Sequence, residues 1–434
     1  MKERKEKSMF EKASRLVRRL QEGEFQERLR RTDPHENAMN RNRARYISAL
    51  EEFRRLYGDR TVEIYSAPGR TEIGGNHTDH QRGRVLAASV NLDIIAVVSP
   101  TEDNLITLKS AGYAPVCVNL AELQPVTEEN GTSAALIRGV VSELEAVGFR
   151  AGGFRAYVTG DVPGGAGLSS SAAFEILTGT VISGLYHNMQ IPAQTLARAG
   201  QEAETRYFGK PCGLMDQMSC SVGGLIYIDF ANDPPEVRRL ETDFERFGHA
   251  LCIVETGGSH AAMTDEYTAI PAEMHQIAGF YHKEVLAQVE PEVFWRDIPT
   301  LRKKFGDRAV LRAIHWFGET CRVSAQADAL EAGDFPEFLR LIRASGNSSF
   351  QYLQNVSSRR DPREQPIALA LAVSDKILAG RGAARVHGGG FAGTIQAFVP
   401  EDLVEEYKKS LDGIFGEGAC HVLRIRKYGG MKVI

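Results

Sequence analysis

A glycine- and serine-rich segment, residues 164–172 (GGAGLSSSA), constrains the fold of this chain more than any other sequence feature. The residues before it, FRAYVTGDVP, alternate as a half-buried strand does, and SAAFEILTGTVISGLYH after it has helical periodicity. Glycines let an anion approach the backbone closely, and the free N–H groups at a helix N-terminus attract it. The segment predicts an anion site, although a serine cap after a flexible turn is an alternative that it leaves open by itself. It is not a Walker A loop, because no GK[ST] follows.

Composition bounds the class of protein. The chain has 434 residues, 43% hydrophobic and 25% charged, which is ordinary for a globular protein of two domains or one large one. A net charge of −4 does not indicate a protein that binds nucleic acid or an anionic membrane surface, because such binding favours an excess of basic residues. Six scattered cysteines form no CxxC pair, and no apolar run reaches the length of about 18 residues that a membrane span needs. We therefore expect a cytoplasmic protein without nucleic-acid or membrane partners.

The pattern of apolar and polar residues changes along the chain. Residues 1–31 read as amphipathic helices packed on the main body, and the polar stretch 32–43 reads as a linker. From Thr61 onward, short apolar strands broken by glycine mix with helices, and residues 271–345 are mainly helical in pattern. This order predicts an α+β architecture of two lobes.

Three segments carry a resemblance to a known family: GRTEIGGNHTDH (69–80), PGGAGLSSSAA (163–173) and RVHGGGFAGTIQA (385–397). In this order they resemble the three signature motifs of the GHMP kinases. PCGLMDQ (211–217) and TGGSHAAMTDEYTAIPAEM (256–274) resemble the galactokinase branch. The resemblance implies a ribosomal-S5-like N-terminal lobe, a ferredoxin-like C-terminal lobe and an active site in the cleft between them. Together with the pattern of the first residues, it divides the chain into a helical extension with a linker over 1–45, an N-terminal kinase domain over 46–232 and a C-terminal domain over 233–434.

The same resemblance implies roles for individual residues. Asp216 is expected to be the catalytic aspartate, and Arg70 the arginine that pairs with it. ATP is the expected nucleotide, with Mg²⁺ held by Glu204 and a loop serine, for which Ser171 is preferred and Ser170 is close behind. The expected nucleotide-binding residues of the loop are Gly164, Gly165, Gly167, Leu168, Ser169, Ser170 and Ser171.

The sugar site departs from the family pattern. Most galactokinases read GRVNLIGEHTDY where this chain reads GRTEIGGNHTDH, so Asn76 replaces a glutamate and His80 a tyrosine. That glutamate accepts a hydrogen bond from the C6 hydroxyl, and asparagine removes a charge that would repel a C6 carboxylate. Plant galacturonate kinases lose the same glutamate. Ser133 stands where the family often has an aromatic near adenine. The residues expected to bind the sugar are Asn76, His77, Asp79, Gly213 and Tyr267.

The leading hypothesis is therefore a galactokinase, which converts galactose and ATP to galactose 1-phosphate and ADP. A 1-kinase for galacturonate or another C6-modified hexose is the first alternative, and a non-catalytic galactose sensor is the second. The expected partners are the sugar and ATP, in a monomer or weak homo-oligomer.

Overall fold

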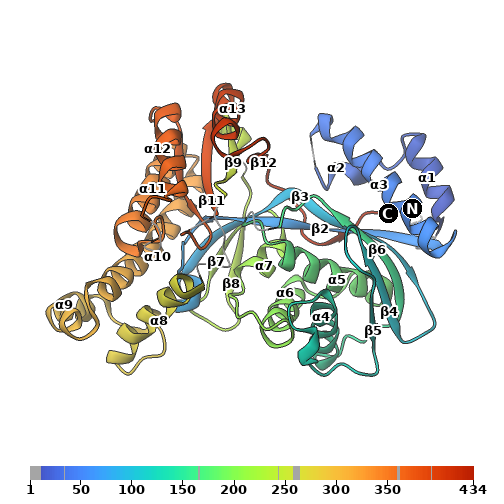
Figure 1. The fold of residues 1–434 in the computed structure, drawn as a ribbon, viewed down its shortest axis with the longest axis horizontal. Coiled ribbons are helices and arrows are strands. Elements are labelled where there is room, and N and C mark those ends of the chain that lie inside the picture. Colours follow the sequence, from blue (N-terminus) through green and yellow to red (C-terminus); the bar gives the residue numbers. More distant parts are fainter. Residues whose placement is uncertain are drawn as a thin grey trace, which may run out of the picture.

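A computed structural model describes residues 11–33, 35–164, 167–242, 244–257, 264–358, 362–391 and 393–434. Its largest feature is a nine-stranded sheet whose main path runs in the order β1-β2-β3-β6-β4-β5 (Figure 1). β7 and β8 extend it beside β3, and β13 pairs with β2. The strands are β1 (Glu11–Lys12), β2 (Thr61–Gly74), β3 (Arg84–Pro100), β4 (Leu105–Ser110), β5 (Val116–Asn119), β6 (Phe154–Gly160), β7 (Leu225–Asp229), β8 (Glu236–Leu240) and β13 (Met431–Lys432).

The long strands β2 and β3 form the spine of the sheet. Both read as nearly continuous buried runs, because layers of helices cover the sheet on its two faces. Their antiparallel pairing shifts register between Pro68 and Arg70 and again between Glu72 and Gly74. Such irregularities bend a strand and re-aim its side chains. The bends fall within the first signature motif.

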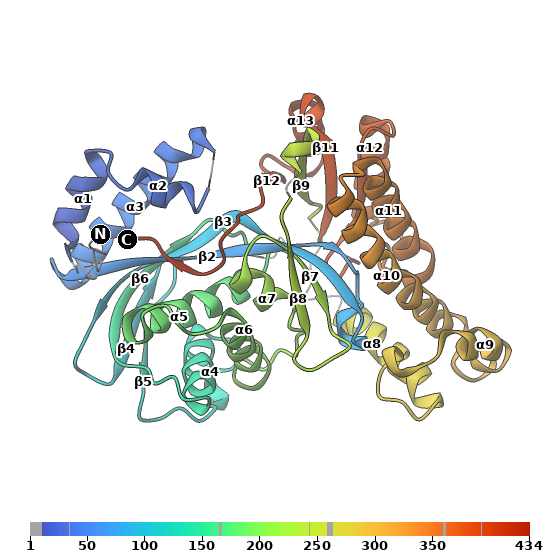
Figure 2. The same cartoon turned by 180° about the vertical axis from the view of Figure 1, so that it is seen from behind.

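One face of the sheet carries α4 (Ser133–Ala146), which precedes the glycine-rich loop, and the helices that follow this loop. The latter are α5 (Ser170–His187), α6 (Ala193–Glu202), the π-helical turn η3 (Ala203–Tyr207) and α7 (Met215–Val222). In Figure 1 they lie below the sheet, and Figure 2 shows the same layer from behind. α5 is apolar all round and buried along most of its length, as a central helix should be.

The N-terminal helices α1 (Ala13–Gln21), α2 (Gln26–Arg30) and α3 (Glu36–Tyr57) lie on the opposite side of the sheet (Figure 2). Leu16, Leu20 and Phe53 form a buried cluster there, so the predicted packing of amphipathic helices on the main body is observed. The predicted linker over 32–43 is wrong, because residues 36–43 form the first turns of α3. Its polar composition hid a narrow buried stripe that includes Met39 and Asn42.

A second, four-stranded sheet has the order β10-β11-β9-β12. Its strands are β9 (His249–Glu255), β10 (Ala383–His387), β11 (Thr394–Pro400) and β12 (Cys420–Leu423). The helices of this lobe are α8 (Thr264–Phe280), α9 (Pro291–Phe305), α10 (Asp307–Ala332), α11 (Phe335–Ser348), α12 (Pro366–Leu378) and α13 (Val404–Phe415), with a π-helical turn η7 (Ser349–Leu353) after α11. β8 pairs with β7 in the first sheet, although it lies beyond the predicted boundary at residue 233.

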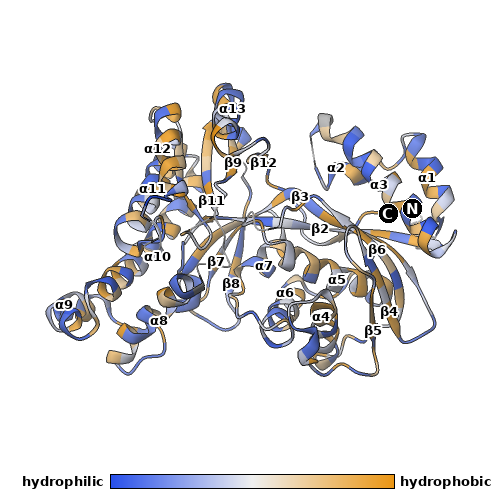
Figure 3. Cartoon of the chain, in the orientation of Figure 1, coloured by the Kyte–Doolittle hydropathy of each residue, from blue (hydrophilic) through white to orange (hydrophobic). Residues whose placement is uncertain are grey.

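Figure 3 shows apolar residues along the strands and both colours on most outer helices, as expected for helices with one buried face. Among the described helices, none combines the length and the apolar character that a membrane crossing requires. The short 3₁₀ turns are η1 (Asp79–Gln81), η2 (Thr127–Glu129), η4 (Glu245–Phe247), η6 (Leu286–Gln288) and η8 (Glu401–Leu403).

Candidate active site

The glycine-rich loop connects β6 to the N-terminus of α5, as the sequence predicts. Gly165 and Ala166 lie outside the described residues; Gly164 is exposed and Leu168 is buried. Gly167 has a φ of +67°, and a Cβ there would lie 3.0 Å from Thr394 Oγ1 and 3.1 Å from His387 Nδ1. Glycine therefore lets the loop lie against the strands of the third motif. The first turn of α5 holds no acidic residue, so its N–H groups are suited to an anion.

Arg70, Asp216 and Ser169 come together from three separate elements. Arg70 Nε donates to Asp216 Oδ1 at 2.6 Å, and Ser169 Oγ donates to Asp216 Oδ2 at 2.6 Å. The Arg70 main-chain N–H donates to Leu168 O at 3.0 Å, which ties β2 to the phosphate loop. The Asp216 side chain keeps 24% of its surface exposed, so an incoming group can reach it. Sequence reasoning placed these residues in one site, and the structure brings them into contact.

The electrostatics of this cluster keep Asp216 ionised. Burial alone would raise the pKa of Asp216, but the Arg70 charge and the hydrogen bonds from Arg70 and Ser169 hold it below its usual value. An ionised carboxylate at the first turn of α7 can accept a hydroxyl hydrogen bond. It is a weak base, however, because the same contacts favour its charged form.

Glu204 lies beside the serines of the loop, at the π-helical turn η3. Ser171 Oγ donates to Glu204 Oε1 at 3.0 Å, and Lys210 Nζ lies 2.9 Å from the same oxygen. Gln217 Nε2 bridges Glu204 Oε2 and Glu175 Oε2, each at 2.9 Å. A carboxylate and a hydroxyl at the mouth of a phosphate loop are oxygen ligands that suit Mg²⁺, which takes its other ligands from water and phosphate. No group of three or more His, Cys, Asp or Glu side chains within the described residues offers an all-protein metal site.

Asn76 is fully buried, and its amide is hydrogen-bonded on every side. Its Nδ2 donates to Gly388 O at 2.6 Å and to Glu72 Oε1 at 3.3 Å. Its Oδ1 accepts from Asn355 Nδ2 at 2.8 Å and from Ser349 Oγ at 3.3 Å. An asparagine amide has two donors and two acceptor sites, so the protein itself occupies all four. In this structure Asn76 joins the first motif to the third, and it offers no free group to a sugar.

His77 and Asp79 frame the turn that follows. His77 has a left-handed φ of +57°, and its Nε2 lies 3.1 Å from Gly389 O. Burial lowers the pKa of His77 to about 4, so the ring is neutral at pH 7. Burial, followed by the charges of Glu72 and Asp216, raises the pKa of Asp79 to about 6. Gly213 is packed directly against Asp79 Oδ2, where a Cβ would overlap that oxygen.

Tyr267 contacts the loop of the third motif from α8. Its hydroxyl donates to Gly390 O at 2.7 Å, and its ring meets Phe391 edge-on with centroids 5.4 Å apart. A Cβ at Gly389 would overlap the Tyr267 ring, so glycine is needed for this contact. Part of the segment before α8, residues 258–263, and Ala392 of the third motif lie outside the described residues.

Sequence reasoning missed the buried ion pair between Glu72 and Arg385, whose Nη2 lies 2.6 Å from Glu72 Oε1. The signal was present in GRTEIGGNHTDH, where Glu72 stands at the asparagine and Asn76 at the glutamate of GRVNLIGEHTDY. Glu72 and Asn76 are hydrogen-bonded to each other. Compared with the family pattern, the carboxylate therefore stands four residues earlier, at position 72, and the cluster keeps it. His387 was missed as well. Its Nε2 lies 3.0 Å from Thr71 Oγ1 and holds β10 against β2.

Two family models match this chain. The galactokinase galactose-binding signature matches residues 51–100, and the N-terminal domain of the GHMP kinases matches residues 135–224. These matches cover the first and second motifs and the elements that carry Arg70, Asp216 and Glu204. The protein is a phosphotransferase with the GHMP kinase fold. Its residues 51–100 are similar to the galactose-binding signature of the galactokinases.

Solved structures share the fold at low sequence identity. The galactokinase of Lactococcus lactis, complexed with galactose, has a TM-score of 0.75 at 24% identity, covering 88% of this chain and 98% of that chain. The mevalonate kinase of Methanococcus jannaschii gives 0.59 at 17% identity, covering 84% and 98%. The phosphomevalonate kinase of Streptococcus pneumoniae, in complex with phosphomevalonate and AMPPNP, gives 0.56 at 10%, covering 83% and 98%.

Proposed function

We propose that this protein is a galactokinase, which transfers the γ-phosphoryl group of ATP to the C1 hydroxyl of galactose. The contact of Asp216 with both Arg70 and Ser169 carries the proposal, because it sets a partly exposed, ionised carboxylate beside the phosphate loop. Phosphoryl transfer needs a positioned acceptor for the hydroxyl proton and cationic groups around the transferring phosphoryl. The galactose-binding family model over residues 51–100 supports the sugar.

In the proposed reaction the C1 oxygen forms a bond to Pγ, and the bond from Pγ to the bridging oxygen of ADP breaks. Asp216 orients the hydroxyl and accepts its proton as negative charge moves onto the phosphoryl oxygens. Arg70 holds Asp216 in place and offsets charge near the loop. The N-terminus of α5 binds the phosphates. Ser171 and Glu204 would hold Mg²⁺, which neutralises phosphate charge when bound.

The sugar is proposed to be neutral at C6. Asn76 was expected to ease the binding of a C6 carboxylate by removing a charge, but Glu72 keeps a carboxylate in the same cluster. That carboxylate is already paired with Arg385, so this pair leaves no net positive charge to attract a uronate. His77, Asp79, Gly213 and Tyr267 remain the proposed sugar contacts, with the Asn76 network holding the turn that carries the first two.

An ADP-release assay over galactose, galacturonate, galactosamine, arabinose and glucose tests the proposal. We expect galactose to give the highest kcat/KM and galacturonate to be at least about 100-fold poorer, which corresponds to roughly 2.7 kcal/mol. Turnover should disappear in Asp216→Ala. A higher kcat/KM for galacturonate than for galactose would favour the alternative function, a galacturonate 1-kinase. Sugar binding without ADP release from any member of the panel would select the sensor.

A further inference from the structure

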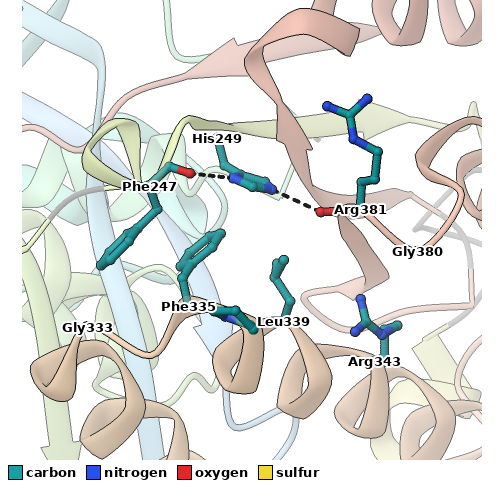
Figure 4. A pocket seen from close by; sticks show the side chains of 9 residues that line it. Phe247, His249, Gly333, Phe335, Leu339, Arg343, Gly380 and Arg381 are labelled. Atoms are coloured by element: carbon teal, nitrogen blue, oxygen red, sulfur yellow. Dashed lines mark hydrogen bonds between the residues drawn. The ribbon is translucent and has the colours of Figure 1, made fainter.

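A hollow on the C-terminal lobe has no part in the site described above. It has a volume of about 440 Å³ and is lined by residues from β9, the start of α11 and the turn between α12 and β10 (Figure 4). This volume falls within the usual range for small-molecule sites. None of its lining residues belongs to the signature motifs.

The apolar side of the hollow is rigid and aromatic. Phe335 and Leu339 of α11 are buried, with 5% and 6% of their surface exposed. Phe247 stacks on Phe335 with ring centroids 4.6 Å apart and planes inclined by 8°. His249 packs on the same ring, and its two nitrogens lie 2.8 Å from Phe247 O and 3.1 Å from Arg381 O. A neutral His249 ring donates to one of these two carbonyl oxygens. The stacked rings form the aromatic wall before any ligand binds.

Two arginines stand on the rim of the hollow: Arg381 is paired with Asp402, and Arg343 acts electrostatically on the carboxyl of Asp375. Arg343, one turn after Leu339 on α11, gives one N–H to Gly382 O at 2.8 Å. That is the only hydrogen bond of its guanidinium to another described residue, so further N–H groups remain for a ligand. Figure 4 shows the Arg343 guanidinium at the edge of the hollow, whereas the Arg381 side chain turns away toward its partner Asp402. A planar apolar group against Phe335 and Leu339 would place an attached anionic group near Arg343.

Two elements beside the hollow, α11 and β10, extend from it to the candidate active site. α11 runs from Phe335 to Ser348, whose Oγ lies 2.9 Å from His315 Nδ1, and His315 Nε2 lies 2.9 Å from Asn76 O. At about 1.5 Å per residue, α11 links points roughly 20 Å apart. On the other side, the Arg381 turn opens β10, which ends at His387 against Thr71. A ligand in the hollow would contact the far ends of two elements that hold the first and third motifs.

We propose that this hollow is a regulatory binding site for a small aromatic anion, a planar ring that bears a carboxylate, sulfonate or phosphate group. Binding braces the start of α11 against the Arg381 turn and changes the affinity of the active site for its sugar. Binding of the anion does not depend on the proposed function. The effect on sugar affinity does rest on the proposed function, so anion binding and sugar affinity are measured in separate experiments.

The test uses the full-length protein and the fluorescent aromatic anion 1-anilinonaphthalene-8-sulfonate, with excess inorganic pyrophosphate at the glycine-rich loop, because ADP is itself an aromatic anion and would compete for the hollow. We expect one equivalent to bind and indole-3-acetate to displace it. Arg343→Gln should weaken binding by about tenfold or more, because it removes a charge-assisted hydrogen bond. Leu339→Trp, which fills the hollow, should abolish binding.

Arg340→Gln is the matched control, because Arg340 lies on the same helix and is paired with Glu337 on an exposed surface. We expect this variant to bind within about twofold of the wild type. Absence of binding, or binding that Arg343→Gln leaves unchanged, would overturn the proposal. Isothermal titration of sugar with and without the bound anion tests the coupling, and equal sugar affinities would overturn the regulatory role.

Discussion

Asn76→Glu restores the family residue, yet we expect it to destabilise this protein. The substitution removes the donor that Gly388 O accepts at 2.6 Å and brings a second carboxylate to the oxygen of Glu72 that Asn76 Nδ2 approaches at 3.3 Å. A buried acceptor left without its donor costs about 1–3 kcal/mol. Two buried carboxylates in contact add a repulsion or protonation cost of similar size, so the free energy of unfolding should fall by about 3–5 kcal/mol.

The double variant Glu72→Asn with Asn76→Glu should recover part of this loss. Arg385 Nη1 is buried and hydrogen-bonds to no other described residue, so this cluster keeps a donor for a carboxylate at position 76 while asparagine occupies position 72. We expect a coupling free energy of about 1–3 kcal/mol in a double-mutant cycle. Asn76→Asp serves as the control for added volume, because it introduces the charge without the extra methylene group.

Urea unfolding followed by tryptophan fluorescence measures these free energies. Trp316 is a suitable reporter, because it is buried and its indole N–H donates to Thr78 O at 3.1 Å, within the first motif. A loss below about 1 kcal/mol for Asn76→Glu, or strictly additive effects in the cycle, would contradict the argument that Asn76 and Glu72 form one buried unit.

Three further predictions concern the site. Asp216→Asn should lower kcat in the ADP-release assay by about 10²–10⁴-fold while leaving the fold intact by circular dichroism; activity within tenfold of wild type would remove Asp216 from the mechanism. Asp79→Asn should stabilise the protein by about 1–3 kcal/mol at pH 7, because the raised pKa of Asp79, about 6, makes its ionisation oppose folding as pH rises from about 4 to 6. The gain should vanish below pH 4 in unfolding curves, and a gain that is constant with pH would assign it to packing. Glu204→Gln should raise the Mg²⁺ concentration needed for half-maximal turnover by about tenfold or more and weaken Mn²⁺–nucleotide binding measured by electron paramagnetic resonance, whereas unchanged values would place the metal elsewhere.

The sequence by itself predicted the architecture and the position of the glycine-rich loop. Glycines before a helix N-terminus, β-branched runs and short motifs are local signals, because they act through backbone conformation and nearest neighbours. They predicted the loop at 164–172 and the two-lobed α+β fold, whereas the grouping of Arg70 with Asp216 was implied by the resemblance to the GHMP kinases. The same local signals failed over 32–43, where a polar composition concealed the buried stripe of α3.

Only the tertiary structure decided the surroundings of the sugar site. Asn76 contacts Asn355 and Gly388, and Glu72 contacts Arg385, across separations of about 280 to 313 residues. No local pattern reports such partners, because whether a buried polar group is free or saturated depends on what the fold brings around it. Asn76, a predicted sugar contact, is therefore the centre of a hydrogen-bonded network in the structure, while the glycine-rich loop lies between β6 and α5, where its own residues predicted it.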